Sequence, residues 1–387
     1  MMQPSTLPIR PDLAGLEPYG APQLDLPVRL NVNEFPYAPP QAVVDSILKA
    51  VGEAAQTLNR YPDRDFDDLR LALAGYLNEE SQLTGPAQLA PDNIWAANGS
   101  NEVMLHLFQA FGGPNCAALT FGPTYSMYPE YARDTFTSWH AIERNQDFSI
   151  DLDLAANAIA EAKPAIIILC SPNNPTGTAL TLPEIETILA AANQVIVPGT
   201  NHAQPVVIVD EAYGEFRRIG TPSALELLPE YPNLAVSRTM SKAFGAAGLR
   251  LGYLAAGPQL IDSLRLVRLP YHLSAITQAA ATAALGHAQQ MQAQVAEIRD
   301  RRDALEQWLR QQPGLQTTPS DANFVMFGRF ADRHQVWQQL ADQGVLIREV
   351  GPPGWLRVTV GSETETESFK KTLTEILAHA VVLSSSD

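Results

Sequence analysis

The 387-residue sequence is poor in lysine and cysteine, and it contains no long apolar run. Arginine supplies almost all of its 26 basic side chains, because only five of them are lysine. The two cysteines, Cys116 and Cys170, have neither a Cys-x-x-Cys spacing nor a neighbouring histidine, so we assign no metal ligand. No apolar run approaches the ~20 residues of a membrane span, and residues 1–10 lack the apolar core of a signal peptide. These absences predict a cytoplasmic protein.

The sequence also lacks an excess of positive charge. Its 42 acidic and 26 basic side chains give a formal net charge of −16. Basic patches bind nucleic acids and anionic membrane surfaces, so we expect neither as a partner. An anionic small molecule remains possible, because salt screens charges beyond roughly 8 Å and a local pair of arginines can still bind it.

Uncharged apolar runs alternate with helix-like segments through the middle of the chain. The runs at residues 165–170, 206–209 and 234–236 predict buried strands. Continuous apolar strands separated by helices are typical of a mostly parallel sheet with both faces covered. The sequence therefore predicts an α/β fold, in which a ligand binds at the carboxyl ends of the strands.

The pattern divides the chain into three predicted parts. Residues 1–40 are irregular and rich in proline, as expected of an arm that lies across another part of the protein. Residues 41–285 form a large α/β domain, and residues 286–387 alternate helices with short strands in a smaller α+β domain. No internal repeat is visible.

Chemically distinctive residues follow three of the predicted strands. Residues 171–177 read Ser-Pro-Asn-Asn-Pro-Thr-Gly, residues 210–213 read Asp-Glu-Ala-Tyr, and residues 237–245 read Ser-Arg-Thr-Met-Ser-Lys-Ala-Phe-Gly. Arg250 lies eight residues beyond the lysine. Taken singly, each feature is more simply a turn, a cap, a surface lysine or a salt-bridge residue. Together and in this order they are specific, because they bring an amide, an acid, a phenol and two cations to one edge.

Pyridoxal phosphate chemistry requires this set of groups. Lysine forms a Schiff base with an aldehyde once it is desolvated, whereas arginine does not deprotonate in proteins. We therefore predict that Lys242 binds the cofactor and then carries the proton. Asp210 faces the pyridine nitrogen and keeps it protonated, which makes the ring an electron sink. Asn174 and Tyr213 donate hydrogen bonds to the ring oxygen.

The cofactor's phosphate requires amide donors, hydroxyls and positive charge. Ser100 and Asn101 stand at a predicted helix start, where backbone N–H groups bind anions. Thr239, Ser241 and Arg250 supply the hydroxyls and the charge. Tyr125, which follows another strand, is either a core aromatic or a residue that stacks on the cofactor ring.

The motifs together resemble the fold-type I aminotransferases of classes I and II. Within these, the sequence is similar to the histidinol-phosphate aminotransferase family from about residue 12 to residue 378. Four motifs carry this finer resemblance: residues 30–37 (Leu-Asn-Val-Asn-Glu-Phe-Pro-Tyr), 60–63 (Arg-Tyr-Pro-Asp), 123–128 (Pro-Thr-Tyr-Ser-Met-Tyr) and 356–361 (Leu-Arg-Val-Thr-Val-Gly). The resemblance implies ping-pong transfer of an amino group between glutamate and histidinol phosphate, in histidine biosynthesis.

The resemblance also implies roles for residues outside the strand ends. Tyr61 reaches the cofactor phosphate of the other subunit, which makes the active unit a homodimer. Arg357 binds the α-carboxylate of glutamate, while Arg348 and Tyr19 of the arm hold the substrate phosphate, because arginine binds carboxylate and phosphate by paired hydrogen bonds. Asn33 lies near the imidazole end of the substrate. The arm then contributes to both the small domain and the active site.

The sequence departs from the family pattern at two motif positions. Phe35 stands where the family has asparagine, beside the expected specificity pocket, and Asn101 replaces a frequent aspartate. The cofactor residues alone also fit an aromatic amino acid aminotransferase or a phosphothreonine-type decarboxylase. A non-catalytic regulator built on this fold requires a DNA-binding extension, for which residues 1–40 are too short and not basic.

Overall fold

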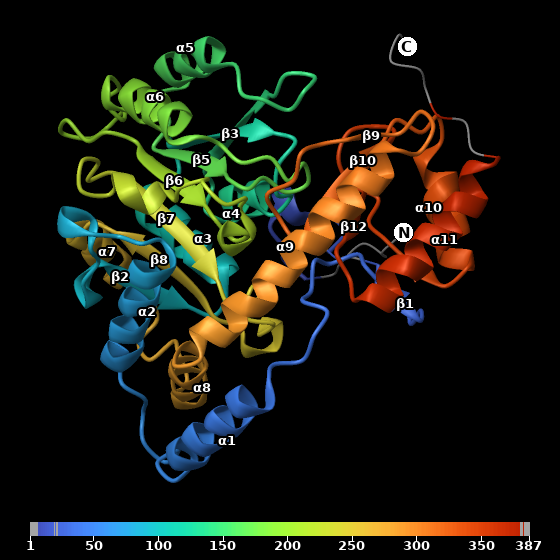
Figure 1. Cartoon of the computed structure of the whole chain (residues 1–387). Helices are drawn as coiled ribbons and strands as arrows, with labels where there is room; N and C mark the ends of the chain where they lie inside the picture. The colour runs from blue at the N-terminus through green and yellow to red at the C-terminus, as the bar shows by residue number, and fades with distance from the viewer. Residues whose placement is uncertain (1–6, 19, 21, 380–381, 383–387) are drawn as a thin grey trace.

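A seven-stranded sheet with helices on both sides forms the larger part of the molecule (Figure 1). The structure is a computed structural model and describes residues 7–18, 20, 22–379 and 382. The strand order is β2-β8-β7-β6-β5-β3-β4. The strands are β2 (Ile94–Ala97), β3 (Ala117–Gly122), β4 (Ser138–Glu143), β5 (Ile166–Cys170), β6 (Val206–Asp210), β7 (Leu234–Thr239) and β8 (Gly252–Ala256).

The sheet is mostly parallel, as the apolar runs predicted. Every residue of β5, β6 and β7 is buried, which explains why these strands contain almost no polar side chains before their last residues. Only β8 runs against its neighbours β2 and β7. The first residue of β8, Gly252, therefore pairs with the last residues of β2 and β7, Ala97 and Thr239. Arg250 thus reaches the same edge as the strand ends, although it precedes its strand.

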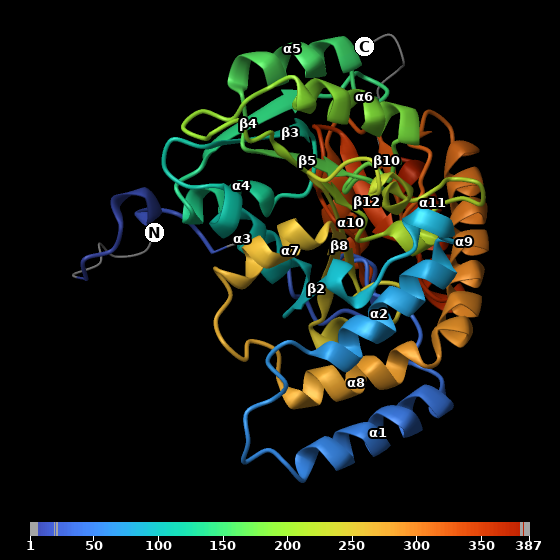
Figure 2. The ribbon, with the colours of Figure 1, turned by 90° about the vertical axis from the view of Figure 1, so that its left-hand side faces the viewer.

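Helices cover the sheet and extend below it. Figure 2 shows α5 and α6 side by side, and α1 along α8. Several helices begin at the side-chain caps that sequence rules predict: Asp151, Thr181 and Ser274 each accept a hydrogen bond from a backbone N–H of the first turn. The helices are α1 (Gln41–Ala55), α2 (Asp67–Glu80), α3 (Ser100–Phe111), α4 (Tyr128–Asp134), α5 (Leu152–Ala162), α6 (Leu182–Asn193), α7 (Pro258–Arg265) and α8 (Ala275–Leu285).

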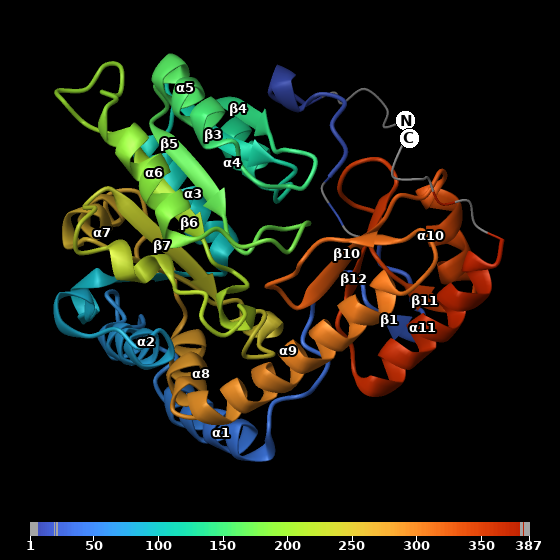
Figure 3. The ribbon, with the colours of Figure 1, turned by 45° about the horizontal axis from the view of Figure 1, so that its top comes forward.

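The C-terminal part is a smaller α+β arrangement. The long helix α9 (Ala288–Arg310) runs from the seven-stranded sheet to this part (Figures 1 and 3). Strand β10 pairs antiparallel with β9 and β12, and helices α10 and α11 pack beside them. The elements are β9 (Gln316–Thr317), β10 (Phe324–Gly328), α10 (Arg333–Asp342), β11 (Val345–Leu346), β12 (Trp355–Thr359) and α11 (Glu363–Leu377).

The N-terminal arm is joined to the C-terminal part by strand pairing. Strand β1 (Val28–Arg29) runs parallel to β11, with Val28 opposite Val345. The next residues also cross over, because the N–H of Thr359 donates to the carbonyl of Leu30. Two segments more than 300 residues apart in sequence are therefore hydrogen-bonded to each other.

The described part of the chain contains neither a membrane-spanning helix nor a metal-binding cluster. No helix there is long and apolar enough to cross a membrane. Nor do three histidine, cysteine or acidic side chains gather there in a way that could hold a metal ion.

Candidate active site

A cavity of about 330 Å³ opens at the carboxyl edge of the seven-stranded sheet, between that sheet and the C-terminal part. Its lining comes from three parts of the chain: the loops that follow β2, β3, β5, β6 and β7, the N-terminal arm, and the segment around β12. Thirteen of the fifteen residues predicted from the sequence line it: Asn33, Ser100, Asn101, Tyr125, Asn174, Asp210, Tyr213, Thr239, Ser241, Lys242, Arg250, Arg348 and Arg357.

Lys242 presents its amine to this cavity without a carboxylate partner. Its Nζ donates to the carbonyl of Val32, 3.0 Å away, and among the described residues it forms no ion pair. Desolvation lowers the pKa of Lys242 to about 8, and the positive charges of Arg357 and Arg250 act in the same direction. A lysine in this setting supplies the neutral amine that nucleophilic and proton-transfer chemistry requires.

Asp210 is a buried acid at the end of β6. Its Oδ2 accepts a hydrogen bond from the hydroxyl of Tyr128 at 2.7 Å, and its Oδ1 accepts from the N–H of Ala212 at 3.1 Å. Burial raises the pKa of Asp210 to about 6, although the Tyr128 hydrogen bond opposes this. A cation placed beside the carboxylate would restore its ionised form.

Tyr128 received no role from the sequence, although it lies three residues after Tyr125 in the same motif. It is fully buried, so its contact with Asp210 is sheltered from water. The sequence indicates only that Tyr128 stands at the start of a helix, α4. It does not indicate that an acid 82 residues further on is the hydrogen-bond partner of Tyr128.

Tyr213 stands at the centre of a buried hydrogen-bond network. Its hydroxyl oxygen accepts from Asn33 Nδ2 at 2.9 Å and from Asn174 Nδ2 at 3.4 Å. Asn174 Oδ1 in turn accepts from Arg357 Nη1. Burial raises the pKa of Tyr213 to about 12, so its hydroxyl stays protonated at neutral pH. Because both amides donate to the oxygen, the tyrosine's own proton can be donated to a ligand.

One end of the cavity is built to hold an anion. Helix α3 begins there, beside Ser241, whose Oγ accepts from Arg250 Nη1 at 3.3 Å. The backbone approaches closely: a Cβ at Gly99, whose φ is +89°, would lie 2.5 Å from Arg250 Nη2, and one at Gly252 would lie 2.1 Å from the nitrogen of Ser100. Helix-terminal N–H groups, hydroxyls and a guanidinium are the donors that a phosphate group accepts from.

The other end of the cavity carries two arginines held by one backbone pairing. The N–H of Arg348 donates to the carbonyl of Arg357 at 3.0 Å, and the reverse bond is 2.9 Å long. Arg357 Nη2 also donates to the carbonyl of Asn31 at 2.9 Å. The buried Nη1 of Arg348 has no hydrogen-bond partner within the described chain. An orphaned guanidinium nitrogen in a cavity indicates a place for an anionic ligand.

One predicted residue, Tyr61, lies away from this cavity. It is 80% exposed on the surface, where its ring stacks on Tyr271 with centroids 4.5 Å apart. Tyr19 lies outside the described residues. Phe35, expected beside the specificity pocket, does not line the cavity; it packs against the rings of Tyr37 and Phe216 because the interior there is apolar.

A larger cavity of about 590 Å³ lies between the end of α2, the loop after β6 and the start of α9. Two of its three arginines are already paired: Arg217 with Glu211 at 3.1 Å, and Arg218 with Glu306 at 2.9 Å. The Nε of the third, Arg299, has no hydrogen-bond partner within the described chain. Among the described residues, four glutamates line this cavity and no lysine does, so the smaller cavity is the better candidate for a ligand with both an anionic group and an aldehyde.

The donor set of the smaller cavity fits pyridoxal 5'-phosphate. The cofactor's phosphate matches the anion end around Ser100 and Arg250, its aldehyde matches the amine of Lys242, and its pyridine nitrogen matches the buried carboxylate of Asp210. These complementary groups line one cavity, as the sequence motifs predicted.

Comparisons with known proteins agree with this chemistry. The family model described as aminotransferase class I and II matches residues 27–375. Histidinol-phosphate aminotransferase of Bifidobacterium longum (strain NCC 2705) is 54% identical over 380 residues, 97% of each chain. That of Thermobifida fusca (strain YX) is 55% identical over 367 residues, 95% of each chain. The crystal structure of histidinol-phosphate aminotransferase from Sinorhizobium meliloti in complex with pyridoxal-5'-phosphate shares the fold, with a TM-score of 0.76 and 24% identity over 91% of each chain. The chain therefore belongs to the class I and II aminotransferases and, within them, to the histidinol-phosphate aminotransferase family.

Proposed function

We propose that this protein transfers an amino group between glutamate and histidinol phosphate by a ping-pong route that uses pyridoxal 5'-phosphate. The observation that carries the proposal is the cavity, in which the amine of Lys242 lies between two cationic ends. One end suits the cofactor phosphate. The other, with Arg348 and Arg357, suits the anionic groups of the two substrates, which occupy the same place in turn.

The chain's own residues hold the cofactor and move the proton. Pyridoxal 5'-phosphate, when bound, supplies the electron sink that stabilises negative charge at the substrate's Cα. Lys242 would hold the cofactor at its aldehyde carbon. Once the substrate's amine has displaced it, the free Nζ of Lys242 would carry the proton at the substrate's Cα, for which a pKa near the working pH is best. Asp210 faces the pyridine nitrogen, and the hydroxyl of Tyr128 orients the carboxylate.

The remaining side chains are assigned to the other groups of the cofactor. Tyr213 and Asn174 would donate to the ring oxygen, and in the structure the Nδ2 of Asn174 donates to the Tyr213 hydroxyl at 3.4 Å. Tyr125 covers the ring. The phosphate is held by Ser100, Asn101, Thr239, Ser241 and Arg250.

Substrate recognition falls to the other end of the cavity. Arg357, oriented by Asn174 and by the carbonyl of Asn31, binds the α-carboxylate of glutamate. Arg348, whose Nη1 is orphaned, binds the phosphate of histidinol phosphate together with Tyr19. Asn33, which donates to the hydroxyl of Tyr213, is assigned to the imidazole end of the substrate.

The proposed active unit is a cytoplasmic homodimer. Tyr61 is too exposed to act in its own subunit, and leucines around it, such as Leu58 and Leu269, are also exposed. A second copy of the chain would cover this surface and receive Tyr61 at its cofactor phosphate. Within each subunit, residues 1–40 form the arm, residues 41–285 the cofactor domain and residues 286–387 the small domain.

A two-substrate assay tests the proposed reaction. Purified holoenzyme is given 2-oxoglutarate with either histidinol phosphate or phenylalanine, and glutamate formation is followed. We expect kcat/KM to favour histidinol phosphate. Equal or better turnover of phenylalanine would make the protein an aromatic amino acid aminotransferase. Release of carbon dioxide from phosphothreonine, without consumption of 2-oxoglutarate, would make it a decarboxylase.

A further inference from the structure

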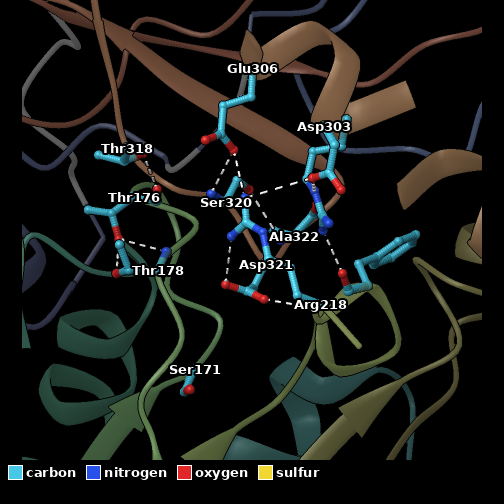
Figure 4. Close-up of polar contacts among 12 residues, drawn as sticks. Ser171, Thr176, Thr178, Arg218, Asp303, Glu306, Thr318, Ser320, Asp321 and Ala322 are labelled. Atoms are coloured by element: carbon cyan, nitrogen blue, oxygen red, sulfur yellow. Dashed lines mark hydrogen bonds and ion pairs between the residues drawn. The ribbon is translucent and has the colours of Figure 1, made fainter. Parts of the chain in front are cut away.

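Segment 318–322, between α9 and β10, ties together two loops of the seven-stranded sheet (Figure 4). The carboxylate of Asp321 accepts from the backbone N–H of Arg218 at 2.7 Å and from its Nη1 at 3.2 Å. The backbone N–H of Asp321 donates to the carbonyl of Gly177 at 2.7 Å. Asp321 is therefore hydrogen-bonded both to the loop after β6 and to the loop after β5.

Further contacts fix this segment against α9. Glu306 Oε2 accepts from Arg218 Nη2 at 2.9 Å and from the N–H of Ser320 at 3.1 Å. Arg302 Nη1 donates to the carbonyl of Phe216 at 2.6 Å. Glu306 and Arg302 are buried, and Asp321 is only 8% exposed. Charged hydrogen bonds in such places are stronger than those on the surface.

The backbone at this point has little room to move. Gly177 has a φ of +79°, and a Cβ added to it would lie 2.5 Å from Ser320 Oγ. Thr318 Oγ1 also donates to the carbonyl of Thr176, next along the same loop. A shift of the loop after β5 therefore requires segment 318–322 to shift with it.

The two loops carry side chains of the proposed active site. Asn174 lies three residues before Gly177, where it contacts Arg357 and Tyr213. Tyr213 lies five residues before Arg218. Asp321 itself does not line the cavity, so it can affect the ligand only through these neighbours.

We propose that Asp321 is a positioning residue, which sets Asn174 and Tyr213 against Arg357 through the Gly177 carbonyl and Arg218. The inference rests on the proposed function, because it assigns to these side chains the recognition of a substrate carboxylate. A displacement of about 1 Å at such a site can cost on the order of 10² in rate. The phosphate end of the cavity, around Ser100, is not in contact with segment 318–322.

Asp321→Asn is the first test, since it keeps the shape and removes the charge. The probe is glutarate, an unreactive dicarboxylate, titrated into the holoenzyme and followed by the absorbance of the bound cofactor. We expect the dissociation constant of glutarate and the KM of glutamate to rise about tenfold and kcat to fall less. The affinity for pyridoxal 5'-phosphate should fall by a much smaller factor, because Tyr213 is only one of several side chains assigned to the cofactor.

Asp303→Asn is the matched control. Asp303 lies on α9 in the same cluster, and its side chain is 52% exposed (Figure 4). Its carboxylate is 3.8 Å from Arg218 Nη2, and its Oδ1 accepts from Arg302 Nε at 2.8 Å, a bond that does not reach either loop directly. We expect this variant to bind glutarate as the unaltered protein does. Arg218→Gln is a second test that leaves the backbone hydrogen bonds of Asp321 in place, so glutarate affinity should fall about threefold.

Four outcomes separate the possible results. A loss of glutarate affinity that is much larger than the loss of cofactor affinity supports the positioning role. Unchanged glutarate affinity in both Asp321→Asn and Arg218→Gln overturns it, as does an equal loss of glutarate and cofactor affinity, which would indicate general destabilisation. If the unaltered holoenzyme neither binds glutarate nor transaminates, the proposed function fails and the inference fails with it.

Discussion

Two groups of arginines in this molecule differ in whether carboxylates neutralise their charge. Arg238, at the end of β7, is completely buried and is surrounded by carboxylates, with Glu211 at 2.7 Å, Glu215 at 3.2 Å and Glu80 at 3.3 Å. Arg250 and Arg348 lie in the active-site cavity, and no carboxylate in the described chain is within ion-pair distance of either.

The paired Arg238 stabilises the fold, whereas the unpaired Arg250 and Arg348 are available to bind ligands. Burial alone would raise the pKa of Glu211, but Arg217 and Arg238 overcome this effect and lower it, so this carboxylate stays ionised. Burial raises the pKa of Glu215 in the same cluster, although Arg238 opposes this. In the cavity, the anions that pair with Arg250 and Arg348 are those of the ligands. Arg250 is exposed to water, whereas the buried Nη1 of Arg348 has no partner in the described chain until a ligand binds.

The strongest test of this contrast is Lys242→Ala. Lys242 belongs to the cavity group, so its loss should abolish chemistry without harming the fold. We expect kcat to fall by at least roughly 10³-fold, together with loss of the absorption of the lysine-bound cofactor, while the free energy of unfolding does not decrease. Lys371→Ala, on the exposed face of α11, is the control and should leave kcat unchanged. An active Lys242→Ala enzyme would contradict the proposed reaction.

Arg238→Met tests the other side of the comparison. It leaves Glu80, Glu211 and Glu215 facing one another in the interior, and breaking a buried ion pair in this way costs about 3–5 kcal/mol. The denaturant midpoint of the protein should show this loss. Arg265→Met removes a partly exposed ion pair with Asp262 and should cost below about 1 kcal/mol. Equal effects of the two substitutions would remove the distinction drawn above.

Arg348→Ala tests whether Arg348, an unpaired arginine of the cavity, binds the phosphate of histidinol phosphate. We expect kcat/KM for histidinol phosphate to fall about 10²-fold, because the phosphate loses its guanidinium. Phenylalanine has no phosphate, so its kcat/KM should change much less. Steady-state kinetics with both amino donors gives the answer, and an equal loss for the two substrates would show that Arg348 does not bind the phosphate.

Lys242→Met in the cofactor-free protein gives the smallest expected effect. The pKa of Lys242 is about 8 in the folded state against 10.5 unfolded, so the unfolded chain binds more protons between these values and stability rises with pH across this window. Below pH 8 the buried charge is a full cost to the fold. The methionine variant should therefore melt about 2 °C higher at pH 7, with the difference vanishing near pH 10.5. A constant difference across this range would assign the effect to packing.

The parts of the fold that the sequence predicted are those in which local pattern and burial agree. Strands β5, β6 and β7 are buried on both faces, so their sequences are continuous apolar runs. Strand β4 stands at the sheet edge with four of its six residues exposed, and α8 is rich in alanine with little contrast between its faces, so neither produced a clear pattern.

The same reasoning explains the site. Lys242, Asp210 and Asn174 directly follow apolar strands, and parallel strands bring their ends to one edge. The pairing of Arg348 with Arg357 depends on how the C-terminal part closes over the sheet, and only the family resemblance suggested it. The hydrogen bond from Tyr128 to Asp210 and the position of Phe35 depend on packing between distant segments, which no local pattern encodes.

The joining of the arm to the C-terminal part has a consequence for how the enzyme is made. Val28 pairs with Val345, and the carbonyl of Asn31 orients Arg357 across 326 positions of sequence. A growing polypeptide on the ribosome cannot complete the substrate end of its pocket until β12 has emerged, although the strands that carry Lys242 and Asp210 are synthesised much earlier. The protein therefore cannot bind its substrate until the last part of the chain has been synthesised.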